Sequence, residues 1–188
     1  MALKGKISYN SPVILSFVFI SIAVLAVSAI SHGKFAMFLA LKKTFSWQLL
    51  TYIFAHADIQ HLTGNMMLML LVGPVAEEKY GSKNLLIMTF STAIISGILN
   101  CLLFHVGIMG ASGIVFMLIV LSAFTNIQQG KIPLTLILVV ICYLGNEVLT
   151  GVLSTDNISQ FGHIAGGIMG MIWGFIYMYG DKEKSAES

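Results

Sequence analysis

The longest uncharged stretch of this chain runs from Asn84 to Gly130, 47 residues without an aspartate, glutamate, lysine or arginine. About 20 apolar residues in a helix span the hydrocarbon core of a bilayer, so this stretch has room for two spanning helices. Over all 188 residues, 57% are hydrophobic and 10% are charged, whereas soluble domains carry about 25% charged residues. The sequence therefore predicts an integral membrane protein, and its net charge of +2 gives no indication of nucleic-acid binding.

Charged residues and glycines divide the apolar sequence into six predicted membrane spans. Within the uncharged stretch, the break falls at about His105 to Gly110, where a histidine and two glycines interrupt the apolar run. The spans are expected at about residues 12–30, 59–76, 84–104, 112–129, 132–149 and 162–180. We therefore expect an all-α polytopic membrane protein, a single domain over residues 1–188 built as a six-helix bundle.

The segments outside the spans carry most of the charges. The first span is uncharged over 19 residues, longer than the apolar part of a typical signal peptide, and we expect it to be retained. Residues 31–58 combine lysines with Phe35, Phe38 and Trp47, which is typical of an interfacial segment with short amphipathic turns. We expect residues 151–161 to form a loop that acts as a lid together with the outer end of the fifth span, and the charged tail, 181–188, to be disordered.

Lysine placement predicts how the bundle lies in the membrane. All ten basic residues are lysines, and an inside N-terminus puts seven of them on the inner side and three on the outer side. The positive-inside rule then favours a protein of the cell inner (plasma) membrane with both termini in the cytoplasm. Spans two, four and six would all begin on the outer side. The inner lysines would be Lys4, Lys6, Lys79, Lys83, Lys131, Lys182 and Lys184, and the outer ones Lys34, Lys42 and Lys43.

Ser112 lies in Gly110-Ala111-Ser112-Gly113, where the fourth span begins. Free N–H groups and the positive dipole end of a helix N-terminus favour the negative charge that develops on a carbonyl oxygen during acyl transfer. The glycines let a peptide backbone approach closely. A serine nucleophile still needs a base, and alone the pattern also fits a small residue at a packed helix interface. It is not a nucleophile elbow, because Ile114 stands where that motif needs glycine.

His163 is the candidate base, at the head of the sixth span. A histidine inside a membrane span indicates a functional site, and its ordinary pKa near 6.5 suits a general base. Gly162, Gly166, Gly170 and Gly174 recur every four residues along one helix edge, an arrangement that lets a second helix approach closely. If the helix that begins at Ser112 docks there, the imidazole and the hydroxyl can form a hydrogen bond. The alternative is a histidine that caps the helix at the interface.

His61 and Asn65 are spaced i, i+4 on the second span, so they share one helix face from which both could donate to an oxyanion. His56 is expected to order the loop beneath them. A metal ion held by His56, His61 and His163 is the competing interpretation, but the chain lacks a His-Glu-x-x-His pattern and has few nearby carboxylates. We expect no metal and no cofactor. Since no aspartate is clearly placed to orient the base, we expect a serine–histidine dyad without an acid.

Together these motifs resemble the rhomboid family of intramembrane serine proteases, in its minimal bacterial six-helix form. They occur in the family's order, within a resemblance that covers about residues 12–180. The motifs are His56-Ala-Asp-Ile-Gln-His61-Leu-Thr-Gly-Asn65, Gly73-Pro-Val-Ala-Glu77-Glu-Lys-Tyr-Gly81-Ser82, Gly110-Ala-Ser112-Gly113 and Gly162-His163-Ile-Ala-Gly-Gly167.

The resemblance implies a role for each catalytic candidate. Ser112 would be the nucleophile and His163 the general base and acid, and the oxyanion hole would comprise His61, Asn65 and the Ser112 backbone N–H. Gly110, Gly113, Gly166, Gly170 and His56 would support them. The expected reaction is hydrolysis of a peptide bond in or near the outer end of the transmembrane segments of protein substrates in the lipid bilayer. The competing functions are an inactive relative that binds transmembrane helices and a small channel or transporter. The oligomeric state is not indicated.

Two further positions follow from the resemblance. Glu77 matches the family's acidic residue at the inner end of helix two, where it would tie helices together. Trp47 matches the tryptophan of a Trp-Arg pair in the first outer loop, but Gln48 replaces the arginine. That departure concerns the hydrogen bonds of the interfacial loop and leaves the dyad intact.

Overall fold

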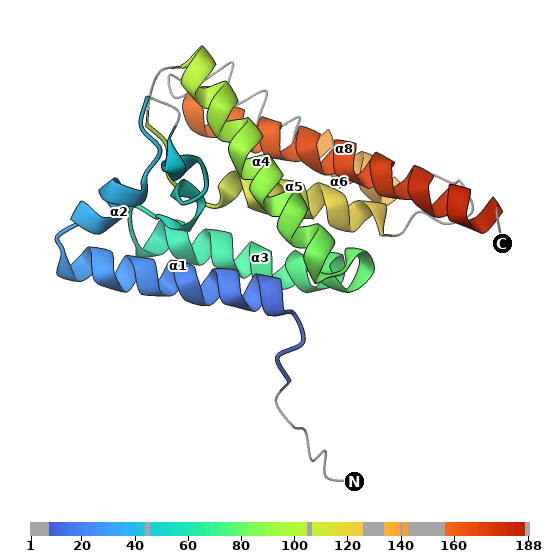
Figure 1. The fold of residues 1–188 in the computed structure, drawn as a ribbon, viewed down its shortest axis with the longest axis horizontal. Coiled ribbons are helices and arrows are strands. Elements are labelled where there is room, and N and C mark those ends of the chain that lie inside the picture. Colours follow the sequence, from blue (N-terminus) through green and yellow to red (C-terminus); the bar gives the residue numbers. More distant parts are fainter. Residues whose placement is uncertain are drawn as a thin grey trace, which may run out of the picture.

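The computed structural model describes residues 8–43, 46–104, 107–125, 134–139, 141–142 and 157–186. All regular elements within these residues are helices (Figure 1), which confirms the prediction of an all-α bundle. The α-helices are α1 (Pro12–Ile30), α2 (Lys34–Leu39), α3 (Ile59–Tyr80), α4 (Ser82–Leu103), α5 (Ser112–Phe124), α6 (Leu134–Val139) and α8 (Asn157–Ala186). Two 3-10 turns, η1 (Trp47–Leu49) and η2 (Tyr52–Phe54), lie between α2 and α3.

Four of the described helices are long and apolar enough to cross a bilayer. They are α1, α3, α4 and the part of α8 from Phe161 to Met178. The protein is thus a polytopic membrane bundle. The predicted fifth span, 132–149, falls mostly outside the described residues, which include α6 from that region. The count of six spans therefore stays a prediction.

Two helix ends differ from the predicted bounds for local reasons. The second span was expected to stop at residue 76, but α3 continues through Tyr80 and ends at Gly81, whose φ of 79° breaks the helix. The fourth span was expected to reach residue 129, but α5 ends at Phe124. There both the backbone N–H and the hydroxyl of Thr125 donate to the Ser122 carbonyl, at 3.2 and 2.6 Å, and close the last turn.

The last helix is longer at both ends than predicted. It begins at Asn157 and ends at Ala186, so residues 157–161 are helical rather than part of a loop, and residues 181–186 are helical rather than disordered. The expectation for the lid is therefore wrong for 157–161, and residues 151–156 lie outside the described part of the chain. Extending a formed helix is cheap once its nucleus exists, and lysine, glutamate and alanine favour helix.

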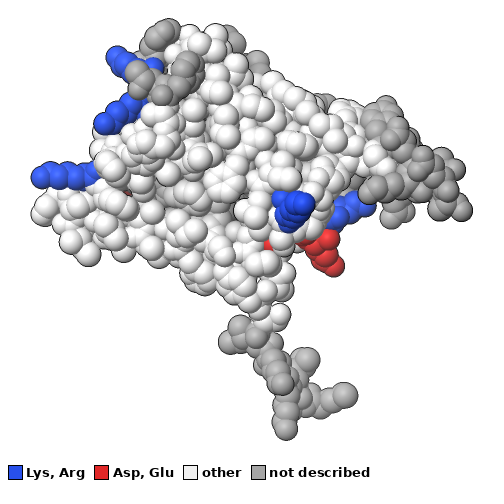
Figure 2. Space-filling view, viewed as in Figure 1, with Lys and Arg blue, Asp and Glu red and all other residues white. Residues whose placement is uncertain are grey.

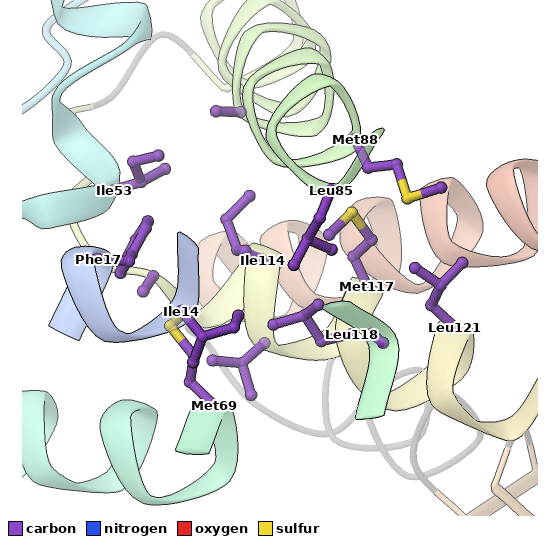
Figure 3. Close-up of a cluster of buried hydrophobic side chains, with 14 of the residues drawn as sticks. Ile14, Phe17, Ile53, Met69, Leu85, Met88, Ile114, Met117, Leu118 and Leu121 are labelled. Atoms are coloured by element: carbon purple, nitrogen blue, oxygen red, sulfur yellow. The ribbon is translucent and has the colours of Figure 1, made fainter. Parts of the chain in front are cut away.

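Helix α5 is the centre of the bundle. Ten of its 13 residues are buried, and α8 lies alongside it while α1 lies alongside α3 (Figure 1). Figure 3 shows Ile114, Met117, Leu118 and Leu121 of α5 among apolar side chains from α1, α3 and α4. A 13-residue helix is about 20 Å long, shorter than the roughly 30 Å core of a bilayer.

The segment between α1 and α3 has the short turns predicted for an interfacial element. Thr51 Oγ1 donates to the Leu39 carbonyl at 3.0 Å, and Gln48 Nε2 donates to the Phe38 carbonyl at 3.4 Å. The buried amide of Gln48 thus joins η1 to the end of α2. Farther along, Leu41 and Ile108 exchange two backbone hydrogen bonds of 3.0 Å, which fixes the loop that leads to α5.

Candidate active site

Ser112 is the first residue of the central helix. The turn before it contains Gly110, which has a φ of 121°, and Ala111. The first-turn N–H groups of a helix have no partner within the helix, so free donors surround the serine. The side chain is half-buried and lines a cavity. Its position at a helix head inside the bundle is the one its motif predicts.

The cavity brings together the side chains that the sequence motifs singled out. Its volume is about 640 Å³. The predicted nucleophile and base, Ser112 and His163, line it from α5 and α8, and His61 and Asn65 line it from α3. Polar groups of α4 complete this wall, and the remaining lining is largely apolar. Further lining residues include Ser96, Asn100, Ile108, Gly110, Gly113, Phe116, Phe161 and Gly162.

The imidazole of His163 lies flat against the ring of Phe116. The ring centroids are 4.3 Å apart and the planes differ by 6°. Phe116 is four residues after Ser112 on α5, so both side chains occupy one helix face. The phenyl ring therefore holds the imidazole on the face of α5 that carries the serine. Sequence analysis missed Phe116, because one more apolar residue in an apolar helix gives no signal of its own.

Glycines bring α5 and α8 into backbone contact beside this pair. A Cβ added at Gly166 would lie 2.0 Å from the Gly113 carbonyl oxygen, and one at Gly170 would lie 2.6 Å from the Met117 carbonyl oxygen. Gly162 differs, because a Cβ there would meet nothing within 4 Å. Its carbonyl oxygen instead lies 3.2 Å from the Cβ position of Gly113. The predicted close edge thus begins at Gly166, and His163 lies between two points of contact with Gly113.

His61 lies against the turn that precedes Ser112. Its backbone N–H donates to Asp58 Oδ1 at 2.7 Å, which caps the start of α3. A Cβ added at Gly110 would lie 2.8 Å from His61 Nε2, and the positive φ of Gly110 already disfavours other residues. Glycine is therefore required here on both counts. The imidazole reaches the cavity next to the serine turn.

Asn65 provides a second polar group from the same face of α3. The residue is 7% exposed, and its Nδ2 has no hydrogen-bond partner among the described residues. Ser96 Oγ, across the cavity on α4, is also buried without a described partner. A buried donor without a partner costs roughly 1–3 kcal/mol. The Asn65 amide is thus a donor available to a group that enters the cavity.

His56 supports the serine turn from beneath, as predicted, and does not line the cavity. Its Nδ1 lies 3.2 Å from the Phe54 carbonyl, to which it donates, and its Nε2 accepts the Ala111 N–H at 3.4 Å. Its ring also meets that of His61 edge-on, with centroids 5.0 Å apart. Burial, followed by the charge of His61, lowers the pKa of His56 from 6.5 to about 4. At neutral pH the imidazole is therefore uncharged, and its two hydrogen bonds join the loop at Phe54 to the turn at Ala111.

Glu77 lies away from the cavity and connects three helices. Its carboxylate accepts the N–H groups of Val13 at 2.9 Å and Ile14 at 3.1 Å, and the Ser82 hydroxyl at 2.7 Å. The first two are free donors of the first turn of α1. This arrangement agrees with a role in tying helices together.

No group of three or more histidine, cysteine, aspartate or glutamate side chains within the described residues is placed to hold a metal ion. The site is thus described by a serine, two histidines, an amide and a helix N-terminus. An all-helical membrane bundle with these groups in one internal cavity defines a polytopic membrane protein with a candidate serine hydrolase site.

Comparison with known proteins identifies the family. The Rhomboid domain model matches residues 43–180, so the chain belongs to the rhomboid family. RHOMBOID-like protein 4 of Arabidopsis thaliana is 33% identical over 140 residues, which cover 70% of this chain and 34% of that protein. Rhomboid-related protein 1 of Caenorhabditis elegans is 29% identical over 157 residues, 76% of this chain and 43% of that protein.

A shorter match is to Rhomboid-like protease 3 of Toxoplasma gondii, 37% identical over 57 residues, 30% of this chain and 22% of that protein. The matched region spans about a third of the length of the Arabidopsis relative. Membership in the rhomboid family supports a function of the intramembrane-protease type.

Proposed function

We propose that this chain is an intramembrane serine endopeptidase that hydrolyses a peptide bond in or near the outer end of transmembrane segments of other proteins. One observation carries the proposal: a single cavity of about 640 Å³ is lined by Ser112, His163, His61 and Asn65. Its volume lies within the range of roughly 300–1,000 Å³ that is usual for binding pockets. Family membership supports the same chemistry.

In the proposed reaction, His163 takes the proton of the Ser112 hydroxyl as Oγ attacks the carbonyl carbon of the scissile bond. The contact of α5 with α8 at Gly113 and Gly166 supports this assignment, because it brings the first turn of α5 against the part of α8 that carries His163. His163 then gives the proton to the leaving amine, and the acyl group stays on Ser112. A water molecule, deprotonated by His163, releases the acyl group and restores the serine.

Three donors would stabilise the oxyanion that forms in each step. They are the backbone N–H of Ser112 at the head of α5, the Asn65 amide and the neutral His61 imidazole. The Asn65 Nδ2 has no hydrogen-bond partner among the described residues, so it is available to an oxyanion. Donors fixed in advance inside a cavity contribute more than mobile ones in water.

The substrate must present an extended peptide to the serine. A transmembrane helix uses its carbonyl groups in its own hydrogen bonds, so the segment has to unwind near its outer end. Glycine, proline and polar residues lower the cost of unwinding, and segments that contain them should be preferred. A small residue before the cleaved bond is the preference that the family resemblance implies.

The orientation belongs to the same proposal. Six spans with both termini in the cytoplasm would open the cavity toward the outer face of the inner (plasma) membrane. The seven-to-three lysine distribution supports this arrangement. A reporter fused to residue 188 should therefore be cytoplasmic.

A matched pair of serine variants tests the catalytic role. Ser112 and Ser122 are both half-buried serines on α5. Ser122 lies near the other end of the helix and does not line the cavity, and its Oγ donates to the Ile119 carbonyl at 2.8 Å. Purified protein would be mixed, in detergent and in liposomes, with a fusion protein whose transmembrane segment has a small residue near its outer end. Ser112→Ala and His163→Ala should abolish cleavage, and Ser122→Ala should cleave like wild type.

Labelling with a broad serine-reactive fluorophosphonate separates an unsuitable substrate from an inactive site. Wild type and Ser122→Ala should be labelled and Ser112→Ala should not. Folded wild-type protein that neither cleaves nor is labelled would overturn the proposal, and a helix-binding protein without catalysis would take its place.

A further inference from the structure

The described residues between Lys34 and Leu50, 34–43 and 46–50, include side chains buried against the bundle and side chains that are exposed. Ala36, Ala40 and Leu41 are buried, whereas Phe38 is 57% exposed and Trp47 is 48% exposed. The rings of Phe38 and Trp47 contact each other, with centroids 5.1 Å apart. Together with the exposed side chains of Met37 and Leu50 they form an apolar surface at the end of the bundle that holds the head of α3.

This surface is held in place rather than carried on a loose loop. Hydrogen bonds from Thr51 and Gln48 join it to the end of α2, as described above. At its other edge, Cys101 Sγ–H donates to the Lys42 carbonyl at 3.4 Å, next to the Leu41–Ile108 pair. The backbone that carries the lysines is therefore anchored to α4 and to the loop before α5.

Three exposed lysines surround the apolar surface, and we call the whole the lysine–aromatic patch: Lys34, Met37, Phe38, Lys42, Lys43, Trp47 and Leu50. No aspartate or glutamate occurs in the sequence from residue 31 to residue 57. Among the residues described, none forms an ion pair with any of these three lysines. Within the described part of the chain, the positive charges of the patch are thus uncompensated.

The opposite end of the bundle is different. Figure 2 shows lysine side chains over α2 and the segment after it, and a second group of lysines beside acidic side chains near the turn between α3 and α4. At that turn two acidic and two basic residues, Glu77, Glu78, Lys79 and Lys83, fall within seven residues. Of these two ends of the bundle, only the one with the patch combines an excess of positive charge with exposed aromatic rings.

We propose that the lysine–aromatic patch binds anionic phospholipid headgroups. Tryptophan and phenylalanine rings of an amphipathic segment lie at the level of the headgroups, where lysine side chains extend to reach lipid phosphates. Anionic lipids attract each lysine near the surface. The patch carries three lysines and no acidic residue, so its charge complements a phosphatidylglycerol-like headgroup better than a zwitterionic one. This site is separate from the cavity and does not depend on proteolysis.

Trp47 provides a reporter within the patch, because the chain has two tryptophans and Trp173 lies in α8. A Trp173→Phe protein would be reconstituted into bilayers that contain brominated phosphatidylglycerol or brominated phosphatidylcholine, which quench fluorescence on contact. We expect brominated phosphatidylglycerol to quench Trp47 with an apparent affinity about 5-fold or more higher than that of brominated phosphatidylcholine. High salt should reduce this preference, because exposed charges are screened.

The control compares charges at the two ends. Lys34→Gln/Lys42→Gln/Lys43→Gln should lose the preference, and Lys79→Gln/Lys83→Gln should keep it. Equal quenching by the two lipids in the single-tryptophan protein, or a preference that survives the triple substitution, would overturn the proposal. A patch that instead serves an acidic segment of a protein partner would give that same equal quenching.

Native mass spectrometry makes the test independent of the Trp173→Phe substitution. Wild-type protein in detergent, titrated with phosphatidylglycerol, should retain more bound lipid than the triple lysine variant and more phosphatidylglycerol than phosphatidylcholine. The same number of bound molecules in both proteins would count against the site. Because neither readout uses a substrate, failure here is distinct from failure of the proposed protease activity.

Discussion

Two groups of buried polar side chains on α3 differ in how completely their hydrogen bonds are satisfied. Near one end, the Glu77 carboxylate accepts from Val13, Ile14 and Ser82. About 18 Å away along the helix, the Asn65 amide nitrogen has no partner among the described residues. Both side chains are less than a tenth exposed, so burial does not explain the difference.

The difference separates a structural group from a candidate functional one. A buried charged group with all its hydrogen bonds made holds helices together, and losing one of its partners is costly. A buried amide with an unmade bond lowers the stability of the folded state, and such groups are expected where a ligand completes the bonding. Substitutions at the two places should therefore affect different measured quantities, stability at Glu77 and rate at Asn65.

The largest effect is expected from a change in the helix contact on which the cavity depends, with both polar groups left in place. In Gly166→Ala the new Cβ would lie 2.0 Å from the Gly113 carbonyl oxygen, so α5 and α8 must move apart. Cleavage should fall to background, and overpacking should cost about 1–3 kcal/mol of stability. Rate and thermal unfolding would be measured together.

Gly180→Ala is the matched control, since a Cβ there meets nothing within 4 Å. It should behave like wild type. If Gly166→Ala kept more than half of the wild-type rate, the close contact would not be needed for the site.

Asn65→Ala should have the second-largest effect, on rate alone. Removing one oxyanion donor typically lowers kcat by about 10²–10³-fold, while stability should stay equal or rise because an unpaired buried amide is removed. Asn84→Ala is the control, because Asn84 Nδ2 donates to the Tyr80 carbonyl at 2.8 Å outside the cavity. It should lose stability and keep its rate. A large fall in the unfolding midpoint of Asn65→Ala would contradict the assignment.

The sequence predicted those parts of the molecule that depend on local pattern. Apolar runs between charges predicted the position of the long helices, and the motifs predicted Ser112 at the head of one of them. Helix ends were predicted less well. The polar Glu77-Glu78-Lys79 run reads as a boundary in a hydropathy pattern, yet backbone hydrogen bonds carry α3 on to Gly81.

Contacts between distant segments were beyond the sequence. Phe116 is one apolar residue among many in α5, and only its stacking on His163, 47 positions later, gives it a role. Likewise, the resemblance implied that Glu77 would tie helices together, but not that the free N–H groups of α1 are its partners. Such partners are decided by packing, which a single sequence does not encode in any local period.

His56 is a buried polar side chain near the site, and unlike Asn65 it has hydrogen-bond partners for both of its ring nitrogens. Its pKa is lowered to about 4 in the folded protein, against about 6.5 in an unfolded chain. Its contribution to stability is therefore complete above pH 6.5. As the pH falls from 6.5 to 4, the unfolded chain takes up a proton that the folded protein excludes, and on the order of 3 kcal/mol is lost.

The unfolding midpoints of wild type and His56→Gln, followed from pH 8 to pH 4, test this. The advantage of wild type should be constant down to about pH 6.5 and shrink from there to pH 4, since other titrating groups are common to both proteins. A difference that does not change with pH would show that the Ala111 N–H does not depend on a neutral imidazole.

Glu77→Gln should have the smallest effect and completes the comparison from the structural end. The amide keeps one oxygen acceptor but turns an NH₂ group toward donors of α1 or Ser82, and it removes the negative charge next to the helix N-terminus. We expect a loss of about 2 kcal/mol in unfolding free energy. The cleavage rate per folded molecule should stay at the wild-type value, because Glu77 does not line the cavity. Glu78→Gln, an exposed neighbour, should change neither quantity. A Glu77→Gln protein with unchanged stability and a reduced rate would reverse the roles assigned to the two ends of α3, and would make the carboxylate part of the reaction rather than of the scaffold.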